Sequence, residues 1–234
     1  MIGDDGDGNG LAPGDYASPP CFLHELDPSW RGIETADAEQ TRRDVMRWRR
    51  AERERLRSLR RQSSTIDKRK ADRRIVAHLL QVMGPLQGLT VGLYIPIHGE
   101  PDMRQLASVI IGEGGFCALP VVIERNRPLI YRCWTPGEKL VPGIWRIPCP
   151  GEDRPVARPD IMLAPVLGFD ARCYRLGNGG GYFDRTLAGQ SPRPKLIGVG
   201  YERLRIASIY PQSHDIPMDA IVTEQGVSRP VGDH

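Results

Sequence analysis

Residues Asp160–Arg185 read DIMLAPVLGFDARCYRLGNGGGYFDR and carry the strongest structural signal in the chain. The segment opens with a short apolar run, Ile161–Pro165, that is typical of a buried strand. It continues into four glycines within the five positions from Gly177 to Gly181, followed by a predicted helix from Tyr182. Glycines let a backbone turn sharply and expose its N–H groups. In front of a helix, such a loop is typical of an anion-binding site.

Similar apolar runs lie on both sides of this segment. They predict strands at Thr90–Ile95, Phe116–Val122, Leu129–Trp134, Ile161–Pro165 and Lys195–Tyr201. Segments long enough for crossover helices lie between several of them, at Met103–Glu113, Tyr182–Leu187 and Arg203–Ser208. Strands that alternate with helices predict an α/β fold, here a single domain with a mixed, partly parallel sheet flanked by helices.

The part before these strands is helical in pattern and rich in arginine. Long straight-chain residues without Gly or Pro run from about Ala36 to Met83. A break near Ser63–Thr65 predicts two helices, with Thr65 as the cap of the second and Gly84–Pro85 as its end. We therefore expect a loop-rich extension over residues 1–40 and one domain over 41–230. In the extension, Cys21 and His24 lack metal-ligand partners at suitable spacing.

Composition excludes several classes of protein. The chain has 234 residues, of which 40% are hydrophobic and 26% are charged, which is typical of a globular domain and not of a disordered chain. Its apolar stretches, such as Ile75–Met83, are shorter than the roughly 20 residues of a membrane span. The first ten residues are acidic and Gly-rich, and the five cysteines form no CxxC pair. These features predict a protein of the cytoplasm with reduced thiols.

Positive charge is concentrated in one segment. Arg42–Arg74 holds 15 Lys or Arg against 5 acids, a local net of +10, whereas the rest of the chain has 17 against 24, a net of −7. Such a block attracts polyanions. Ten of the twenty residues in Arg42–Arg61 are Arg, so a nucleic-acid-binding role is an alternative to nucleotide contact.

Two common phosphate motifs do not fit the glycine loop. A Walker A loop requires Gly-Lys-Ser/Thr after the glycines, and the dinucleotide pattern GxGxxG requires a glycine where Tyr182 stands. The flanking residues still favour phosphate, because Arg175 and Arg185 can contact phosphate oxygens and Asp184 can hold a divalent cation.

The run Arg175–Asp184, RLGNGGGYFD, resembles the signature R-L-G-x-G-G-G-[YF]-[YF]-D of the 5-formyltetrahydrofolate cyclo-ligase (methenyltetrahydrofolate synthetase) family. Other landmarks follow in the family's order. They are Tyr94-Ile95-Pro96 with Glu100, Ala118–Val122, Asp160–Asp170 and His214–Glu224. The resemblance covers about residues 45–227.

The resemblance implies an ATP- and Mg²⁺-dependent ring closure. It would convert 5-formyltetrahydrofolate to 5,10-methenyltetrahydrofolate with release of ADP and phosphate, through a phosphorylated formyl group. In such chemistry the protein mainly positions the reactants and neutralises charge. A non-catalytic folate-binding paralogue is a further alternative. The sequence leaves the oligomeric state open and favours a monomer.

The family's roles are carried over residue by residue. The resemblance implies catalytic roles for Arg175, Tyr182 and Asp184, and metal binding by Asp184 and Asp215. It implies ATP contacts from Arg50, Arg53, Arg61, Arg175, Leu176, Gly177, Asn178, Gly179, Gly180, Gly181, Tyr182 and Phe183. It implies folate contacts from Ile95, Glu100, Asn178, Gly179, Gly180, Gly181 and Tyr182. Trp145 is a further candidate for folate contact by stacking, and the alternative is a half-buried packing residue.

The basic helix departs from the family pattern Lys-x-x-Leu-Arg with a further Arg. One register places the cations at Arg50, Arg53 and Arg61, and a second places them at Arg43, Arg47 and Arg53. Arg keeps the charge of Lys but changes its geometry. Both registers stay open at this stage.

Overall fold

The computed structural model describes residues 36–230 of the chain. The chain divides into two compact units, one ending at Glu54 and the other beginning at Arg55. The predicted boundary at residue 40 is not tested by this division and stays a prediction, and Cys21 and His24 lie outside the described residues.

Two helices occupy the basic segment, as the sequence predicts. Helix α1 spans Ala36–Arg61 and helix α2 spans Thr65–Met83. The predicted cap is wrong by one residue. Ser64 has extended backbone angles and its hydroxyl accepts the N–H of Asp67 at 3.1 Å, whereas Thr65 is already helical. At the other end Gly84 adopts φ 75° and its N–H donates to the Leu80 carbonyl, which ends α2 as predicted.

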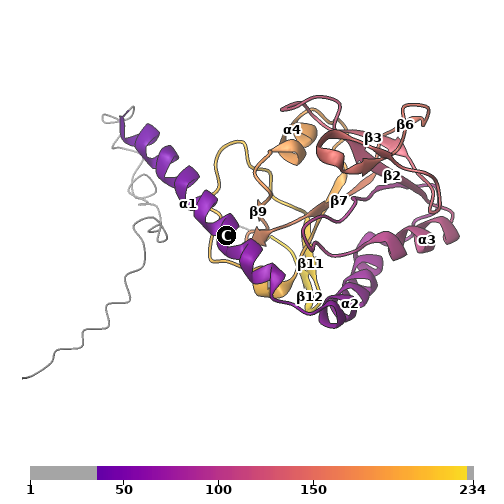
Figure 1. Ribbon diagram of the computed structural model, residues 1–234, viewed down its shortest axis with the longest axis horizontal. Coiled ribbons are helices and arrows are strands. Elements are labelled where there is room, and N and C mark those ends of the chain that lie inside the picture. Colours follow the sequence, from indigo (N-terminus) through magenta and orange to yellow (C-terminus); the bar gives the residue numbers. More distant parts are fainter. Residues whose placement is uncertain (1–35, 231–234) are drawn as a thin grey trace, which may run out of the picture. The chain divides into compact units, whose positions relative to one another are not determined.

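The second unit is built on an eight-stranded mixed sheet (Figure 1). Its strand order is β12-β11-β10-β7-β1-β2-β3-β6. The five central strands β11, β10, β7, β1 and β2 run parallel, and the pairs β11/β12, β2/β3 and β3/β6 are antiparallel. The bounds are β1 Thr90–Gly92, β2 Phe116–Val121, β3 Ile130–Cys133, β6 Val156–Ala157, β7 Ile161–Pro165, β10 Lys195–Val199, β11 Ala220–Thr223 and β12 Gly226–Ser228. The predicted partly parallel α/β sheet is confirmed.

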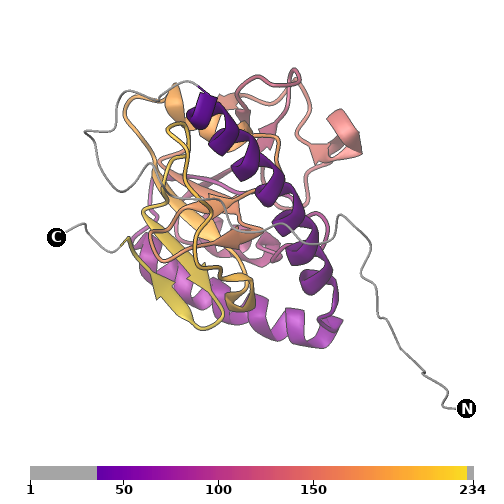
Figure 2. The ribbon, with the colours of Figure 1, turned by 90° about the vertical axis from the view of Figure 1, so that its left-hand side faces the viewer.

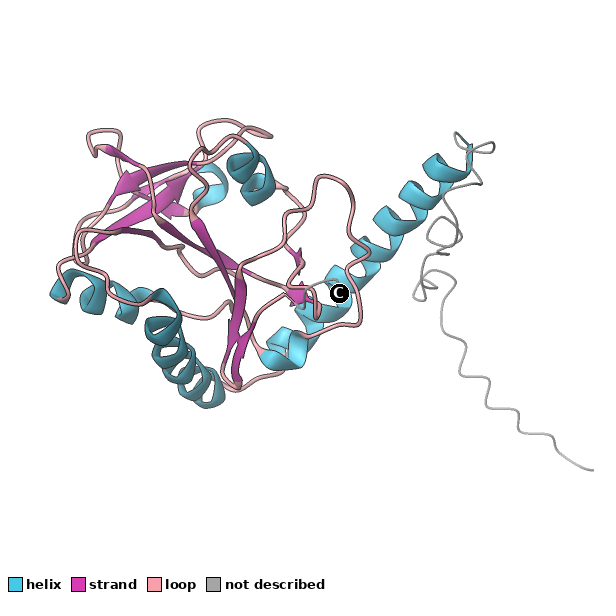
Figure 3. Ribbon diagram, turned by 180° about the vertical axis from the view of Figure 1, so that it is seen from behind, coloured by secondary structure: helices cyan, strands magenta, loops and turns pink. Residues whose placement is uncertain are grey.

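Helices cover both faces of the sheet (Figures 1 and 3). Helix α2 and helix α3 (Arg104–Gly112) lie on one face, and the short helix α4 (Tyr182–Ala188) lies on the other. Figure 2 shows α2 beside the β11–β12 hairpin, drawn in yellow. Helices on both faces leave the central strands buried on both sides, which explains why they are continuously apolar in sequence.

Successive side chains of a central strand pack into two different core clusters, one on each face of the sheet. In β7, Ile161 and Leu163 belong to the cluster that includes α2 and α3, whereas Met162 and Ala164 belong to the cluster that includes Leu187 of α4. Successive side chains of a strand point to opposite faces, so one strand contributes to both clusters.

Most predicted elements are present, and one is wrong. The segment Arg203–Ser208 forms only a 3-10 turn, Glu202–Leu204. Seven strands were not predicted: β4 (Val141–Pro142), β5 (Pro148–Cys149), β6, β8 (Gly168–Phe169), β9 (Arg175–Leu176), β11 and β12. The first five have two residues each, which is too short for a periodic pattern. Within residues 36–230, no helix is both long enough and apolar enough to cross a membrane.

Candidate active site

The glycine loop leaves the hairpin formed by β8 and β9 and enters α4. Gly179 has φ 105° and Gly181 has φ 62°, backbone conformations that residues with a side chain rarely adopt. Gly181 also stands directly before the first helical residue, Tyr182. The loop therefore follows an antiparallel hairpin, which separates it from the loops that follow a parallel strand in the two common nucleotide motifs.

Arg175 and Asp184 lie at the two ends of this loop and pair with each other. The guanidinium Nη2 of Arg175 is 2.9 Å from Asp184 Oδ2, and Nη1 donates to the Ile216 carbonyl at 3.3 Å. The Arg175 guanidinium also lies over the Phe183 ring, 5.7 Å from its centroid. Arg175 is buried, so its charge is held at a fixed position beside the loop.

The structure links the two predicted metal-binding residues through a backbone hydrogen bond. Asp184 Oδ1 accepts the N–H of Ile216 at 3.4 Å, and Ile216 directly follows Asp215. Asp215 Oδ2 accepts the N–H of Gln212 at 2.7 Å. Among residues 36–230 no group of three or more His, Cys, Asp or Glu side chains is arranged to hold a metal. Mg²⁺ bound with a nucleotide uses one or two carboxylates plus phosphate oxygens, and Asp184 and Asp215 fit that role.

Glu100 lies beyond the carboxyl end of β1 and meets the glycine loop. Its Oε1 accepts the side-chain amide of Asn178 at 3.0 Å, and its Oε2 accepts the N–H of Ile97 at 3.0 Å. Burial raises the pKa of Glu100 above its ordinary value, and the two hydrogen bonds and the nearby Arg60 charge act in the opposite direction. The structure thus brings together two predicted site residues, Glu100 and Asn178, that are 78 positions apart in the chain.

Arg60 is a site residue that the sequence did not indicate. Its side chain is 1% exposed, and Nη1 lies 3.9 Å from Glu100 Oε1. Its neighbour Arg61, which was predicted to contact ATP, is exposed. The spacing could have pointed to Arg60, because it follows the apolar Leu56 at i+4 and so lies on the same face of α1, and Leu56 is fully buried in the structure.

Arg57 also reaches the glycine loop, where it donates to the Asn178 carbonyl at 3.2 Å. The basic helix therefore contacts the loop, as expected, but through a residue that neither register named. Arg50 and Arg53 lie in the other compact unit, as do Arg43 and Arg47, which pair with Glu39 and Asp44 respectively. Their nucleotide contacts stay predictions.

Two predicted folate neighbours form an aromatic pair. The rings of Trp145 and Tyr182 meet edge to face at 5.6 Å and 74°. Trp145 is 52% exposed and has φ 55°, within the 3-10 turn Ile144–Arg146. Tyr182 is fixed from its other sides, because its hydroxyl accepts the N–H of Asn126 at 3.3 Å and Arg185 lies over its ring. Ile95 packs at the edge of the larger core cluster.

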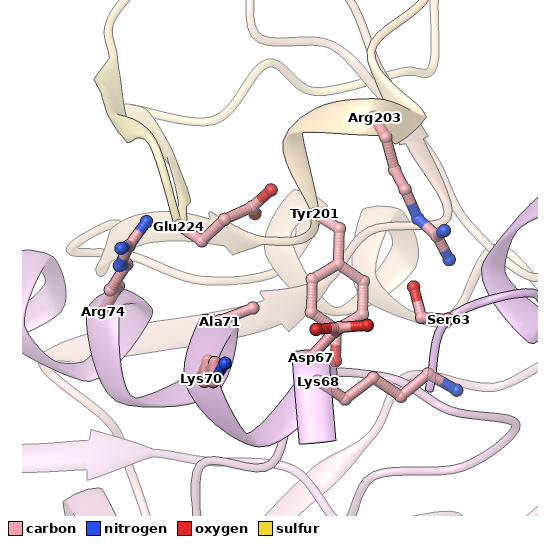
Figure 4. A pocket seen from close by; sticks show the side chains of 9 residues that line it. All are labelled: Ser63, Asp67, Lys68, Lys70, Ala71, Arg74, Tyr201, Arg203 and Glu224. Atoms are coloured by element: carbon pink, nitrogen blue, oxygen red, sulfur yellow. The ribbon is translucent and has the colours of Figure 1, made fainter. Parts of the chain in front are cut away.

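A separate basic pocket of about 280 Å³ lies at the first turns of α2 (Figure 4). It contains no glycine-loop residue. Its lining residues are Ser63, Asp67, Lys68, Lys70, Ala71, Arg74, Tyr201, Arg203 and Glu224. In Figure 4, Arg74 and Glu224 lie at one end of the pocket, and Lys68 and Arg203 lie towards Ser63 at the other. The pocket adjoins the Arg60 side of the Glu100 site, because Arg203 donates to the Arg60 carbonyl and Tyr201 lies near Arg60.

A partly parallel α/β sheet that carries a glycine loop, an Arg–Asp pair and a buried carboxylate has the arrangement of an α/β enzyme. The chain belongs to the 5-formyltetrahydrofolate cyclo-ligase family, whose model matches residues 45–224. This confirms the resemblance found in the sequence and places the chain among ligases.

Individual relatives agree with this assignment. The 5-formyltetrahydrofolate cyclo-ligase of Escherichia coli K12 is 29% identical over 144 residues, covering 59% of this chain and 79% of the relative. That of Haemophilus influenzae is 24% identical over 169 residues, covering 70% and 90%. The 5,10-methenyltetrahydrofolate synthetase of Aquifex aeolicus has a similar structure, with a TM-score of 0.67, 26% identity and coverage of 80% of this chain and 94% of that one. The corresponding protein of Mycoplasma pneumoniae shares the fold, with a TM-score of 0.62 at 23% identity over 75% and 98%.

Proposed function

We propose that this protein converts 5-formyltetrahydrofolate to 5,10-methenyltetrahydrofolate, uses ATP as co-substrate with Mg²⁺, and releases ADP and phosphate. The observation that carries the proposal is the 3.0 Å hydrogen bond between Asn178 and Glu100. It joins the loop expected to bind phosphate to the carboxylate expected to bind folate. A phosphoryl transfer between the two ligands requires that these half-sites be adjacent.

In the nucleotide half, the backbone of Gly177–Gly181 and the buried guanidinium of Arg175 would hold the phosphates. Asp184 and Asp215 would hold Mg²⁺, which when bound neutralises phosphate charge and orients the transferred group. Arg175 is within 2.9 Å of Asp184, so the cationic and anionic groups needed for this role already lie side by side.

In the folate half, Glu100 would accept hydrogen bonds from the amino-pyrimidine edge of the pterin. Tyr182 joins the two halves, because it begins α4 directly after the glycine loop and its ring contacts Trp145. Ile95 and the exposed face of Trp145 would supply apolar contact to the ligand.

The reaction proceeds in two steps. The formyl oxygen on N5 attacks the γ-phosphorus of ATP, the bond to the β-phosphate oxygen breaks, and ADP leaves. The N10 nitrogen then attacks the activated formyl carbon, the carbon–oxygen bond breaks with departure of phosphate, and the N10 proton passes to solvent. The formyl oxygen ends in the phosphate. Arg175 stabilises the charge that develops on the transferred group.

An absorbance assay tests the proposal. The protein, 5-formyltetrahydrofolate, ATP and Mg²⁺ should together produce the absorbance of the methenyl product, and omission of ATP should abolish it. Absence of turnover at every enzyme concentration would reject the proposal and favour a non-catalytic folate-binding role. The monomeric state and the cytoplasmic location remain predictions.

A further inference from the structure

The last turn of α1 buries a guanidinium group without hydrogen bonds. All three nitrogens of the Arg60 side chain are buried, and none has a hydrogen-bond partner among the described residues. The residue is anchored through its backbone, because its carbonyl accepts a hydrogen bond from Arg203 at 3.0 Å. Helix packing therefore fixes the position of the charge, independently of any hydrogen bond made by the side chain.

Such a group is costly to bury. An unpaired buried charge strongly destabilises a folded protein, and buried polar groups almost always have partners. In the part of the chain that the structure describes, the one ion pair of Arg60 is with Glu100 at 3.9 Å. Glu100 is itself 2% exposed in its side chain, so each group is the other's compensating charge.

Other polar groups around this pair do not replace it. Tyr94, Tyr201 and Arg57 lie near Arg60, and His98 lies near Glu100. The Tyr94 hydroxyl donates to the Pro101 carbonyl, and the Tyr201 hydroxyl donates to Asp72. Neither tyrosine hydroxyl therefore donates to Glu100.

The direct hydrogen bonds of Glu100 differ in how easily they can be exchanged. Ile97 donates a backbone N–H from the same short loop, whereas Asn178 donates a neutral side-chain amide from the exposed glycine loop. A ligand that brings its own N–H donors can replace Asn178 at Oε1. It cannot replace Arg60, whose side chain is only 1% exposed.

We propose that Arg60 is a positioning residue for folate recognition, which keeps Glu100 ionised and oriented as a double acceptor while Asn178 occupies its Oε1 until the pterin arrives. This inference rests on the proposed function. An amino-pyrimidine edge presents two adjacent N–H donors, and only an ionised carboxylate can accept both. A neutral Glu100 would present a hydroxyl in place of one acceptor.

Four variants test the proposal: Arg60→Met, Glu100→Gln, the double variant, and Arg73→Met as the matched control. Arg73 is an exposed arginine of α2 outside the site. We expect Arg60→Met to raise the KM for 5-formyltetrahydrofolate about tenfold or more, with the KM for ATP unchanged. Its pH profile of kcat/KM for the folate should lose activity at a higher pH than that of the wild type. Arg73→Met should match the wild type in all three measurements.

The double variant separates positioning from general damage. If Arg60 acts through Glu100, adding Arg60→Met to Glu100→Gln should raise the folate KM no further. Additive effects would overturn the proposal, and so would a folded Arg60→Met protein with a normal folate KM and pH profile. Circular dichroism establishes folding. Should Arg60→Met fail to fold, Arg60→Lys and Arg60→Gln are compared, and an equal rise in folate KM in both would overturn the proposal, because it requires the charge.

If the protein does not have the proposed function, the wild-type protein itself shows this. In that case the wild-type protein neither turns over 5-formyltetrahydrofolate nor changes its tryptophan fluorescence when the folate is added. If the wild type binds the folate without turnover, the same variants are ranked by the dissociation constant from that fluorescence titration.

Discussion

Asp184 forms an ion pair with the buried Arg175 and is also the carboxylate proposed to bind Mg²⁺. We predict that Asp184→Asn lowers turnover to about one hundredth or less of the wild-type value, because the anionic ligand of the metal and the ion-pair partner of Arg175 are lost together. The assay is methenyl product formation at saturating ATP and Mg²⁺. Asp153→Asn, at an exposed loop position, is the matched control and should be unaffected. Near-normal turnover of Asp184→Asn would rule out the metal role.

The environment of Glu100 predicts that activity with the folate falls as the pH is lowered. Burial raises the pKa of Glu100 above its ordinary value. The ionised form that accepts the pterin donors is therefore present above this raised pKa and is lost as the pH falls through it. We expect kcat/KM for the folate to decline on the acid side at a pH above the ordinary range of a carboxyl group. Glu100→Gln should lower kcat/KM and remove that acid decline. Persistence of the same decline in Glu100→Gln would show that another group titrates.

Some residues of the candidate site were identified from the sequence, and others were missed. Glu100, Asn178 and Asp184 were identified through the motif, and the structure places each at the glycine loop or against it. Arg60 and Arg57 were missed because ten arginines in twenty residues look alike in sequence. Only the helical phase relative to Leu56 distinguishes the buried Arg60 from the exposed Arg61.

At the scale of elements, α2 offers a test of its capping residue. Ser64 accepts the N–H of Asp67 and donates its own hydroxyl to the Asp67 carboxylate at 2.7 Å. We predict that Ser64→Ala lowers the free energy of unfolding by about 1 kcal/mol, because a helix N-terminal N–H loses its acceptor. Urea denaturation followed by circular dichroism measures this loss. Thr65→Ala should cost much less, since Thr65 is already inside the helix. The reverse order would restore Thr65 as the cap.

Strands were predictable from the sequence where burial of both faces makes them continuously apolar. The strands β2, β7 and β10 were found within two residues at each end because both of their faces are buried and their sequences are continuously apolar. The two-residue strands β8 and β9 were not found, although β9 begins with the catalytic candidate Arg175. Their pairing depends on the turn between them and on the burial of Phe169 and Leu176 in the core, which a single sequence does not display.

At the scale of the whole molecule, the net charge of +3 conceals a local +10 over Arg42–Arg74. Some of these cationic side chains already interact with other groups among the described residues. Arg60 compensates Glu100, Arg57 binds the glycine loop, and Arg47 pairs with Asp44 at 2.6 Å. Three other cations of this segment line the basic pocket of Figure 4, namely Lys68, Lys70 and Arg74. Arg203, from outside the segment, and two acids complete its charged lining.

This distribution predicts weak, salt-sensitive attraction to nucleic acid and no dedicated binding role. A protein that contacts several phosphates loses affinity by about 10³-fold or more between roughly 50 and 200 mM salt. We therefore expect a labelled oligonucleotide to bind at low salt, as measured by fluorescence anisotropy, and to dissociate at physiological salt. Saturating oligonucleotide at that salt should leave the rate of methenyl formation unchanged. Tight binding that survives physiological salt and competes with turnover would instead assign the basic segment to nucleic acid, because ATP contact alone requires far fewer cations than Arg42–Arg74 supplies.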